Sequence, residues 1–310
     1  MKVYNNLDIK KKHKSSVIAI GNFDGIHSGH QKVIKEAKRK AKKNNLRAGI
    51  ITFEPIPVIF FNPKIKNHRI NSFEQKIDQL KKFNLDFVIT IKFNKGFSKL
   101  TPEQFIKKII FKKTNAKFVY VSKNFRFGNR RKGNIGTLKK YEKDFGYKTI
   151  ITSPLKKVKR TISSTLIRNK ISQGKIYEAN KLLKRFWCIK GKIIRGAKRG
   201  RKIGFPTCNI EMGNYVIPKL GVYSVHVNIG KFNRSGIANL GYRPTFNGQN
   251  LLLEVNIFGI KKNLYDKEIN VYFKKFIRSE KKFKNVEQLK RQIKLDIVNA
   301  KKWQKIIYIF

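Results

Sequence analysis

The feature that most constrains the fold is a regular alternation of short apolar runs and helical stretches in the first half of the chain. The apolar runs that read as buried strands are Val17–Ile20, Ala48–Phe53, Phe87–Ile91, Phe118–Val121 and Thr149–Ile151. The helical stretches between them lie near Gln31–Lys43, Ser72–Phe83, Thr101–Phe111 and Ile135–Phe145. This order predicts a parallel sheet covered by helices, with its ligand crevice at the carboxyl ends of the strands.

Two histidines follow the first of these strands. The apolar run ends at Gly21, His27 and His30 come next, and a helical stretch runs from Ser28 to about Lys43. The free N–H groups and the dipole of a helix N-terminus bind phosphate. Histidine can donate to phosphate oxygens near neutral pH. The sequence therefore predicts a phosphate site at this strand-to-helix turn.

The segment around these histidines reads G-x-F-D-G-x-H-x-G-H. It resembles the HxGH nucleotidyltransferases, and more narrowly the flavin adenylyltransferase module of the bifunctional riboflavin kinase/FAD synthetase family. The resemblance implies a Rossmann-like domain in which His27 and His30 stabilise charge on the phosphates of ATP. It further implies that the residues which bind ATP here are Gly21, Phe23, Asp24, Gly25 and Gly29.

Two other segments at strand ends support this resemblance, and a third departs from it. Residues 124–128 read N-F-R-F-G, which implies that Asn124 binds flavin. Residues 161–168 read T-I-S-S-T-L-I-R, which implies that Ser163, Ser164 and Thr165 hold ATP and that Arg168 is catalytic. The departure is Ile56, which stands where the family has histidine and can neither donate a proton nor hydrogen-bond a phosphate.

The second half of the chain has a different pattern. A helical segment from Thr165 to Leu183 leads into short strands separated by glycine and proline turns. These strands are predicted at Cys188–Ile194, Gly221–Val227, Ser235–Leu240, Leu251–Phe258 and Ile269–Phe276. The spacing indicates a small antiparallel barrel. A last helix, Val286–Trp303, carries apolar residues on one face.

A glycine-rich segment after the first of these strands reads G-A-K-R-G-R-K-I-G-F-P-T-C-N over residues 196–209. Glycines allow the backbone to approach phosphates closely, and hydroxyl and amide oxygens suit Mg²⁺. The segment resembles the riboflavin kinase motif. That resemblance implies that Thr207 and Asn209 hold Mg²⁺, and that ATP is bound by Gly196, Gly200, Arg201, Gly204 and Pro206.

Three more segments resemble the kinase. Residues 218–223 read P-K-L-G-V-Y, residues 238–246 read A-N-L-G-Y-R-P-T-F, and Leu253-Glu254-Val255 corresponds to the strand with the family's catalytic glutamate. A carboxylate between apolar neighbours is costly without a purpose. Arg278 and Phe283 lie in segments that resemble the flavin-side elements. At 183–186, Lys184 stands where the family has glycine, and we expect only a small change in the linker.

The resemblance covers about residues 15–303 and implies two reactions in two domains, residues 1–183 and 184–310. The barrel would phosphorylate riboflavin to FMN, with Glu254 as the general base, and the first domain would adenylylate FMN to FAD. Mg²⁺, ATP and the flavins are the implied ligands. The alternative that Ile56 raises is a riboflavin kinase whose first domain is degenerate.

Composition leaves two more alternatives to weigh. The net charge of +54 would attract nucleic acid nonspecifically, but lysines outnumber arginines and are spread along the chain, so composition bias explains it better. A nucleotidyltransferase acting on another phosphorylated metabolite is disfavoured by the barrel motifs. We expect no specific nucleic-acid or membrane partner. The absence of a long apolar run or signal segment, and only two cysteines, favour a cytoplasmic protein.

Overall fold

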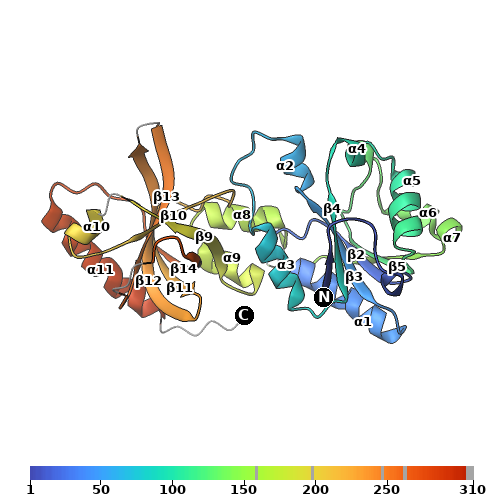
Figure 1. Ribbon diagram of the computed structural model, residues 1–310, viewed down its shortest axis with the longest axis horizontal. Helices are drawn as coiled ribbons and strands as arrows, with labels where there is room; N and C mark the ends of the chain where they lie inside the picture. The colour runs from blue at the N-terminus through green and yellow to red at the C-terminus, as the bar shows by residue number, and fades with distance from the viewer. Residues whose placement is uncertain (158–159, 197–198, 246–247, 261–263, 305–310) are drawn as a thin grey trace. The chain divides into compact units, whose positions relative to one another are not determined.

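The computed structural model describes residues 1–157, 160–196, 199–245, 248–260 and 264–304. It divides into two compact units, and Figure 1 shows the elements of each. The first unit comprises residues 1–66 and 73–163, and the second comprises residues 67–72 and 164–310. By this grouping, residues 164–183 belong with the barrel. The boundary between residues 183 and 184 stays a prediction.

A six-stranded sheet forms the centre of the first unit, in the order β1-β4-β3-β2-β5-β6, and every neighbouring pair is parallel. Its strands are β1 (Lys2–Tyr4), β2 (Val17–Ile20), β3 (Ala48–Glu54), β4 (Phe87–Lys92), β5 (Phe118–Ser122) and β6 (Lys148–Thr152). The predicted parallel sheet is confirmed. Only β1 was not predicted, because three residues with mixed polarity carry no strand pattern.

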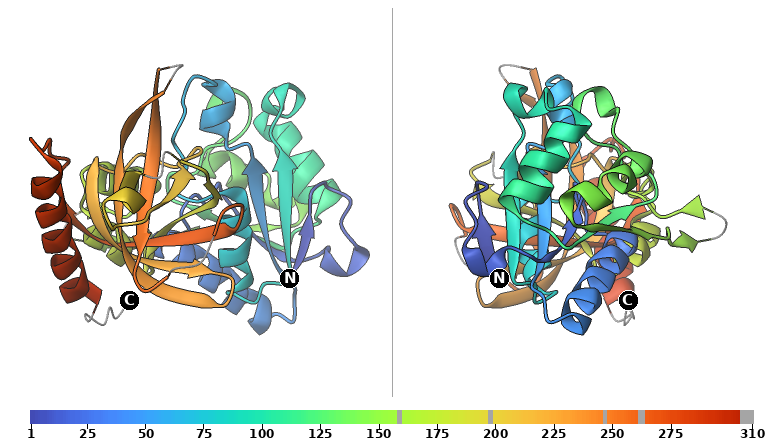
Figure 2. Two further views of the ribbon diagram at one scale, coloured as in Figure 1. Left: turned by 60° about the vertical axis from the view of Figure 1, so that its left-hand side comes forward. Right: turned by 90° about the vertical axis from the view of Figure 1, so that its right-hand side faces the viewer.

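The helices of this unit cover both faces of the sheet, as the right-hand view of Figure 2 also shows. They are η1 (Lys11–His13), α1 (Ser28–Lys43), α2 (Pro57–Phe61), α3 (Phe73–Lys81), α4 (Lys95–Ser98), α5 (Pro102–Phe105), the π-helix η2 (Ile106–Lys113), η3 (Asn129–Arg131), α6 (Ile135–Lys140) and α7 (Glu142–Phe145). Apolar residues of α1 and α3 pack on one face of the sheet. Those of α5, η2 and α6 pack on the other. Burial on both faces explains why the strands are continuously apolar.

Two helical stretches differ from the prediction. The stretch from Thr101 begins with a capping box between Thr101 and Gln104, but after Phe105 it continues as the π-helix η2. The stretch from Ile135 is divided into α6 and α7 at Tyr141. Apolar spacing predicts that a segment is helical, but it does not distinguish the α from the π hydrogen-bond pattern.

The second unit is built around a closed antiparallel barrel of order β10-β13-β12-β11-β14-β9. Its strands are β9 (Trp187–Ile194), β10 (Cys208–Glu211), β11 (Gly221–Ile229), β12 (Phe232–Thr245), β13 (Gly248–Ile257) and β14 (Glu268–Arg278). The predicted barrel is confirmed. The strand that was not predicted, β10, is short and begins in the last two residues of the glycine-rich segment, yet it closes the barrel by pairing with β9 and β13.

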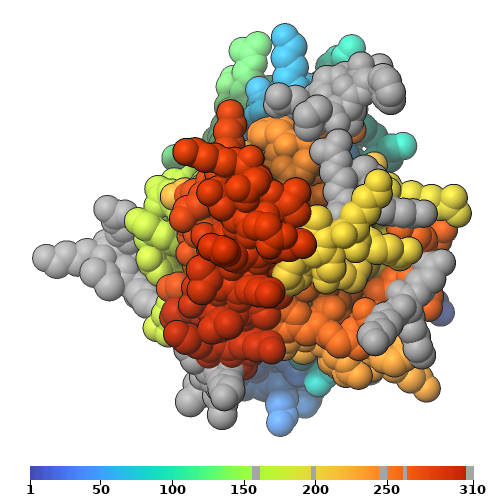
Figure 3. Space-filling model, turned by 90° about the vertical axis from the view of Figure 1, so that its left-hand side faces the viewer, coloured from blue at the N-terminus to red at the C-terminus, as the bar shows by residue number. Residues whose placement is uncertain are grey.

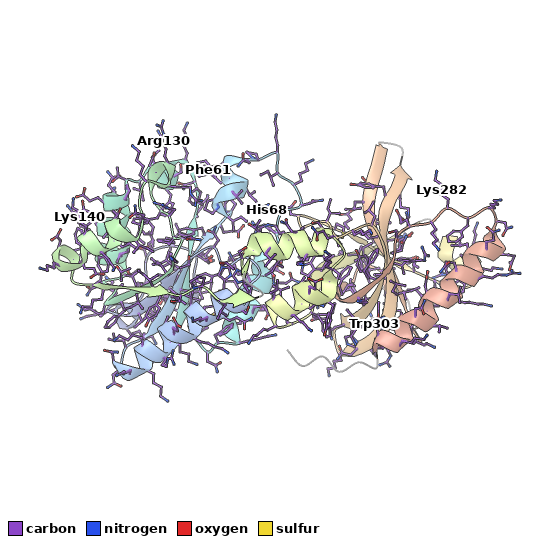
Figure 4. The ribbon with its side chains drawn as sticks, turned by 180° about the vertical axis from the view of Figure 1, so that it is seen from behind. Phe61, His68, Arg130, Lys140, Lys282 and Trp303 are labelled. Carbon is purple, nitrogen blue, oxygen red and sulfur yellow. The ribbon has the colours of Figure 1, made fainter. Side chains whose placement is uncertain are left out.

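Helices flank this barrel, and the first two of them divide the single helical segment that was predicted from Thr165 to Leu183. They are α8 (Ser164–Ser172), α9 (Ile176–Leu183), the short α10 (Arg199–Lys202) and α11 (Val286–Gln304), and a short hairpin, β7 (Lys156–Lys157) with β8 (Arg160–Thr161), precedes them in the chain. Figure 3 shows α11 in red across the outside of the barrel strands. Ile293, Ile297 and Ala300 of its predicted apolar face pack against the barrel. Trp303 lies near the end of α11 (Figure 4), and its ring centroid is 4.5 Å from Nζ of Lys275.

Lys184 ends helix α9 in the left-handed conformation, with φ of 53°, and its N–H bonds the carbonyl of Asn180. Glycine adopts this conformation without strain, whereas a residue with a Cβ pays roughly 1 kcal/mol. The family's glycine at this position therefore has a physical reason, and the present lysine keeps the same helix end at a small cost in stability.

Candidate active sites in the two units

The first site lies in the loop between the end of β2 and the start of α1. His27 is the N-cap residue of α1, and its Nδ1 accepts the backbone N–H of His30 at 3.3 Å. A ring nitrogen that accepts this bond carries no proton, so a neutral His27 has its proton on Nε2. The capping bond thus orients the ring and presents Nε2 as a donor at the helix N-terminus.

His30 stacks on His27, with ring centroids 3.7 Å apart and an interplanar angle of 20°. Phe23 contacts His30 edge-on at 5.2 Å. The Nδ1 atom of His30 is buried and has no hydrogen-bond partner within the described residues. Burial first, and then the nearby charges of His27 and Lys76, hold the pKa of His30 well below its usual value. In the free protein His30 is therefore neutral, with a ring nitrogen ready for a ligand.

The loop between β2 and α1 has an unusual backbone. Phe23 and Ile26 have φ of 48° and 39°, a region that costs residues with side chains energy, and Gly25 has φ of 79°. Such strain is concentrated at functional sites. Gly29 leaves room for the histidine ring, because a Cβ there would lie 3.1 Å from both Cε1 and Nδ1 of His27.

A second loop follows β5, which neighbours β2 in the sheet. The strand order reverses direction between β2 and β5, because β3 and β4 follow on one side of this pair and β6 follows on the other. In such a sheet the ligand crevice lies at the carboxyl ends of the two strands where the order reverses. Asn124 is exposed in this loop. Phe127 belongs to the core, and Phe125 stacks on it at 5.5 Å. Arg130 is exposed on the same loop (Figure 4).

The serine-rich segment is divided between the two units. The carbonyl of Ile162 would lie 3.4 Å from a Cβ on Gly29, so the chain leading to Ser163 runs beside the first turn of α1. Ser164 begins α8 in the second unit, where Arg168 lies close enough to His68 (labelled in Figure 4) for its charge to act on the imidazole. Burial first, then Arg168 and Arg69, lower the pKa of His68.

Two residues near the first site bear on what the sequence predicted. Ile56 is buried and is the N-cap residue of α2, where its side chain makes no capping hydrogen bond. Lys76, which sequence reasoning missed, is also buried and donates to Thr52 Oγ1 at 3.2 Å. A lysine in a mixed helical stretch reads as a solvated residue, and only the fold reveals its burial.

The second site lies on the barrel, where three polar residues face one another across neighbouring strands. Glu254 of β13 is paired directly with Asn209 of β10 on one side and with Asn239 of β12 on the other. Residues in direct register share a face of the sheet. The barrel thus brings the predicted base, Glu254, next to the predicted metal ligand, Asn209, although 45 positions separate them in the chain.

An ion-pair network orients Glu254. Arg243 donates to Glu254 Oε2 from Nη2 at 2.6 Å and from Nε at 3.2 Å, and its Nη1 bonds Glu280 at 3.2 Å. Partial burial by itself lowers the pKa of Arg243, but the two carboxylates outweigh it and raise that pKa above its usual value. Sequence reasoning placed Arg243 in a motif but gave it no role. Its pairing with Glu280 depends on the fold.

The glycine-rich segment adjoins this site. Within it, the N–H of Phe205 bonds the carbonyl of Gly200 at 2.8 Å, and a Cβ on Gly200 would lie 2.4 Å from the carbonyl oxygen of Phe205. Gly204 has φ of 88°. Arg201, Pro206 and Thr207 are exposed beside this turn. Ala197, Lys198 and Phe246, which belong to the quoted motifs, lie outside the described residues.

The oxygen chemistry around Asn209 suits a hard cation. Its Oδ1 is buried and has no hydrogen-bond partner within the described part of the chain. Thr207, which directly precedes β10, adds a hydroxyl, and Glu254, paired with Asn209, adds a carboxylate. These oxygens fit Mg²⁺, which binds a few protein oxygens and keeps waters or phosphate oxygens in its other positions.

Replacing Gly196 by alanine is expected to disturb this site without unfolding the barrel. The new Cβ would lie 1.6 Å from Nδ2 of Asn209, so the side-chain amide must move, and a flexible amide can do so. We expect the catalytic rate of the barrel to fall about 10-fold, as for a displaced ligand or its support, and more Mg²⁺ to be required. A Mg²⁺ titration of the reaction checks this, with the first unit's reaction as the internal control. An unchanged titration would contradict a role for Asn209.

A cavity of about 1280 Å³ opens beside the end of the glycine-rich segment. Gly204, Phe205 and Pro206 line one part of it, and other parts are formed by the β11–β12 turn, the end of β13, the start of β14 and α11. Many of its lining residues are apolar, as is typical of sites for planar ligands.

Arg278 and Phe283 lie close together, with the guanidinium carbon 5.9 Å from the ring centroid. The guanidinium also binds the buried carboxylate of Asp296 in a bidentate manner, with Nε–Oδ1 at 2.9 Å and Nη2–Oδ2 at 2.7 Å. This pair fixes the end of β14 to α11. A contact of either residue with flavin stays a prediction.

Comparison with known proteins decides the family. The model described as FAD synthetase matches residues 9–166, and the model described as riboflavin kinase matches residues 183–304. A bifunctional riboflavin kinase/FMN adenylyltransferase of Buchnera aphidicola subsp. Schizaphis graminum is 41% identical over 305 residues, which is 97% of each chain. The chain belongs to the bifunctional riboflavin kinase/FMN adenylyltransferase family.

Another member of this family and a solved structure also match along nearly the whole chain. The Escherichia coli K12 enzyme is 33% identical over 288 residues, covering 93% of this chain and 92% of its own. A solved structure from Streptococcus pneumoniae, titled a macrolide-efflux protein, covers 97% of this chain and 98% of its own with a TM-score of 0.87 and 32% identity. In the described part of the present chain, every helix is too short or too polar to cross a bilayer.

Proposed function

We propose that the chain makes FMN from riboflavin in its barrel and FAD from FMN in its first unit. The observation that carries this proposal is that each unit presents its own reactive groups in a site suited to phosphate chemistry. The relatives named for both activities match both units, which supports the complete pathway over a kinase with a degenerate first domain.

In the barrel, Glu254 accepts the proton of the ribityl 5′-hydroxyl of riboflavin. The freed oxygen attacks the γ-phosphorus of ATP, the bond to the β-phosphate oxygen breaks, and ADP leaves with FMN as the product. Arg243 orients the Glu254 carboxylate toward this task. The glycine-rich turn lies along the phosphates, and the apolar cavity beside Gly204 receives the adenine. Thr207 and Asn209 would hold Mg²⁺, which neutralises phosphate charge.

In the first unit, a phosphate oxygen of FMN attacks the α-phosphorus of a second ATP, and pyrophosphate leaves as FAD forms. The nucleophile is already ionised, so no strong base is needed. His27 donates from Nε2, and the unpartnered Nδ1 of His30 lies at the same helix N-terminus, where charge that develops on the phosphates is stabilised. Asn124 and Ser163 of this unit hold remaining phosphate and flavin groups.

The test is to incubate the purified protein with riboflavin, ATP and Mg²⁺ and to resolve the flavins by chromatography. We expect FMN first and FAD later, and neither product when a chelator removes Mg²⁺. FMN without FAD would show that the first unit has lost its chemistry and that the substitution at Ile56 is not tolerated. We also propose a cytoplasmic location, because a sequence with only two cysteines implies no disulfide framework, as is usual in a reducing compartment.

A further inference from the structure

Lys76 of helix α3 is a buried lysine that hydrogen-bonds three oxygens near the first site. Its side chain is only 4% exposed. The ammonium donates to Thr52 Oγ1 at 3.2 Å and to the carbonyl oxygens of Asn22 and Phe53, both at 3.5 Å. Burying a lysine costs free energy unless its charge and its protons find partners. An ammonium has three N–H donors, and these three acceptor oxygens lie in the β2–α1 loop and near the end of β3.

These bonds tie together the two strand ends from which the site is built. Asn22 belongs to the β2–α1 loop, whereas Thr52 and Phe53 belong to β3. Thr52 Oγ1 in turn donates to the carbonyl of Asn22 at 3.1 Å, which closes the connection. The next residue, Phe23, has a strained backbone with φ of 48°, and its ring contacts His30. A loop with this strain persists only when its surroundings hold it.

The ammonium also places a positive charge close to His30. Lys76 is among the charges that lower the pKa of that imidazole, after burial and His27. Glu54 lies 3.9 Å from the ammonium and is the acidic partner of Lys76. A buried positive charge beside a phosphate site acts in a low dielectric, where it contributes more than a surface lysine does.

We propose that Lys76 is a positioning residue for adenylyl transfer, which holds the Gly21–His27 loop on β3 and keeps a fixed positive charge near His30. This inference rests on the proposed assignment of adenylyl transfer to His27 and His30. It adds a residue that no motif singled out. Lys76 acts through the loop and through the field at His30, not through contact with the reacting atoms.

The test compares Lys76→Met with Lys76→Arg and with Lys81→Met, a matched control. Lys81 lies on the same helix, 57% exposed, and pairs with Asp78. We expect Lys76→Met to lower kcat for FAD formation about 10- to 100-fold, the effect of losing a charge-assisted hydrogen bond. FMN formation by the same protein should be unchanged. Lys76→Arg should recover part of the rate, and Lys81→Met should alter neither reaction.

A pH profile separates positioning from a merely structural role. Loss of the positive charge of Lys76 raises the pKa of His30. The limb of the kcat/KM pH profile that reports the titration of His30 should therefore move to higher pH in Lys76→Met. This direction is the same whether the neutral or the protonated imidazole is the active form. Thr52→Val removes the hydroxyl but keeps the charge, so it should lower kcat without moving that limb. This variant carries the test if Lys76→Met does not fold.

The outcomes distinguish this inference from the assignment beneath it. If Lys76→Met keeps both its kcat and its pH profile while His30→Ala cannot form FAD, the role of Lys76 is overturned and the site assignment stands. If His30→Ala forms FAD normally, the assignment itself has failed. A loss of FMN formation in Lys76→Met that matches its loss of FAD formation would also overturn the inference.

Discussion

Replacing His30 by alanine is expected to lower the rate of FAD formation from FMN by about 10³-fold, since His30 would be one of the groups that stabilise the developing phosphate charge. Its Nδ1 is buried without a partner in the described structure, and its ring stacks on His27. The measurement is FAD formation from supplied FMN and ATP, followed by chromatography.

The same variant carries its own control, because FMN formation takes place in the barrel. We expect the rate from riboflavin to FMN to be unchanged. His27→Ala should produce a similar loss, and it removes the cap of α1 as well, which costs about 1 kcal/mol of stability. A His30→Ala protein that forms FAD at the normal rate would contradict the assignment of adenylyl transfer to this loop.

Replacing Glu254 by glutamine is expected to produce the reverse result, with FMN formation reduced by about 10²- to 10⁴-fold, the range for loss of a general base. Glutamine keeps the shape and can still accept from Arg243, but it cannot take the proton of the 5′-hydroxyl. The measurement is the rate of FMN formation from riboflavin and ATP. FAD formation from supplied FMN should be unchanged.

The control for this variant is Glu211→Gln. Glu211 is an exposed carboxylate on β10, two residues after Asn209. Because it carries the same charge on the neighbouring strand, its replacement tests whether position, not overall charge, determines the loss. We expect Glu211→Gln to form FMN normally. An equal loss in both variants would remove the specific role of Glu254.

The elements that the sequence predicts well are those with a local pattern. Apolar runs between helical stretches are sufficient to predict the parallel sheet, and turn-bounded strands are sufficient to predict the barrel, because both patterns follow from which faces are buried. Strand β10 was missed because it is only four residues long and its first two residues belong to a glycine-rich motif. Its pairing with β9 and β13 depends on strands distant in the chain.

The sites show the same division. His27, His30 and Glu254 could be proposed from the sequence because motifs carry them. Lys76 and the Arg243–Glu280 pair could not, because their roles depend on contacts across the fold. The bidentate bond of Arg278 to Asp296 likewise needs the packing of α11 on the barrel. The motifs thus predict candidate reacting groups, whose roles stay predictions, and the fold is needed to show what holds these side chains.

The most direct test of two independent sites is to mix the His30→Ala and Glu254→Gln proteins and to supply riboflavin, ATP and Mg²⁺. Alone, the first should stop at FMN and the second should leave riboflavin unchanged. Together they should form FAD, because FMN released by one barrel is adenylylated by the other protein's first unit. If the mixture forms no FAD although each variant is folded, the two reactions do not take place at separate sites that share FMN, and the account is contradicted.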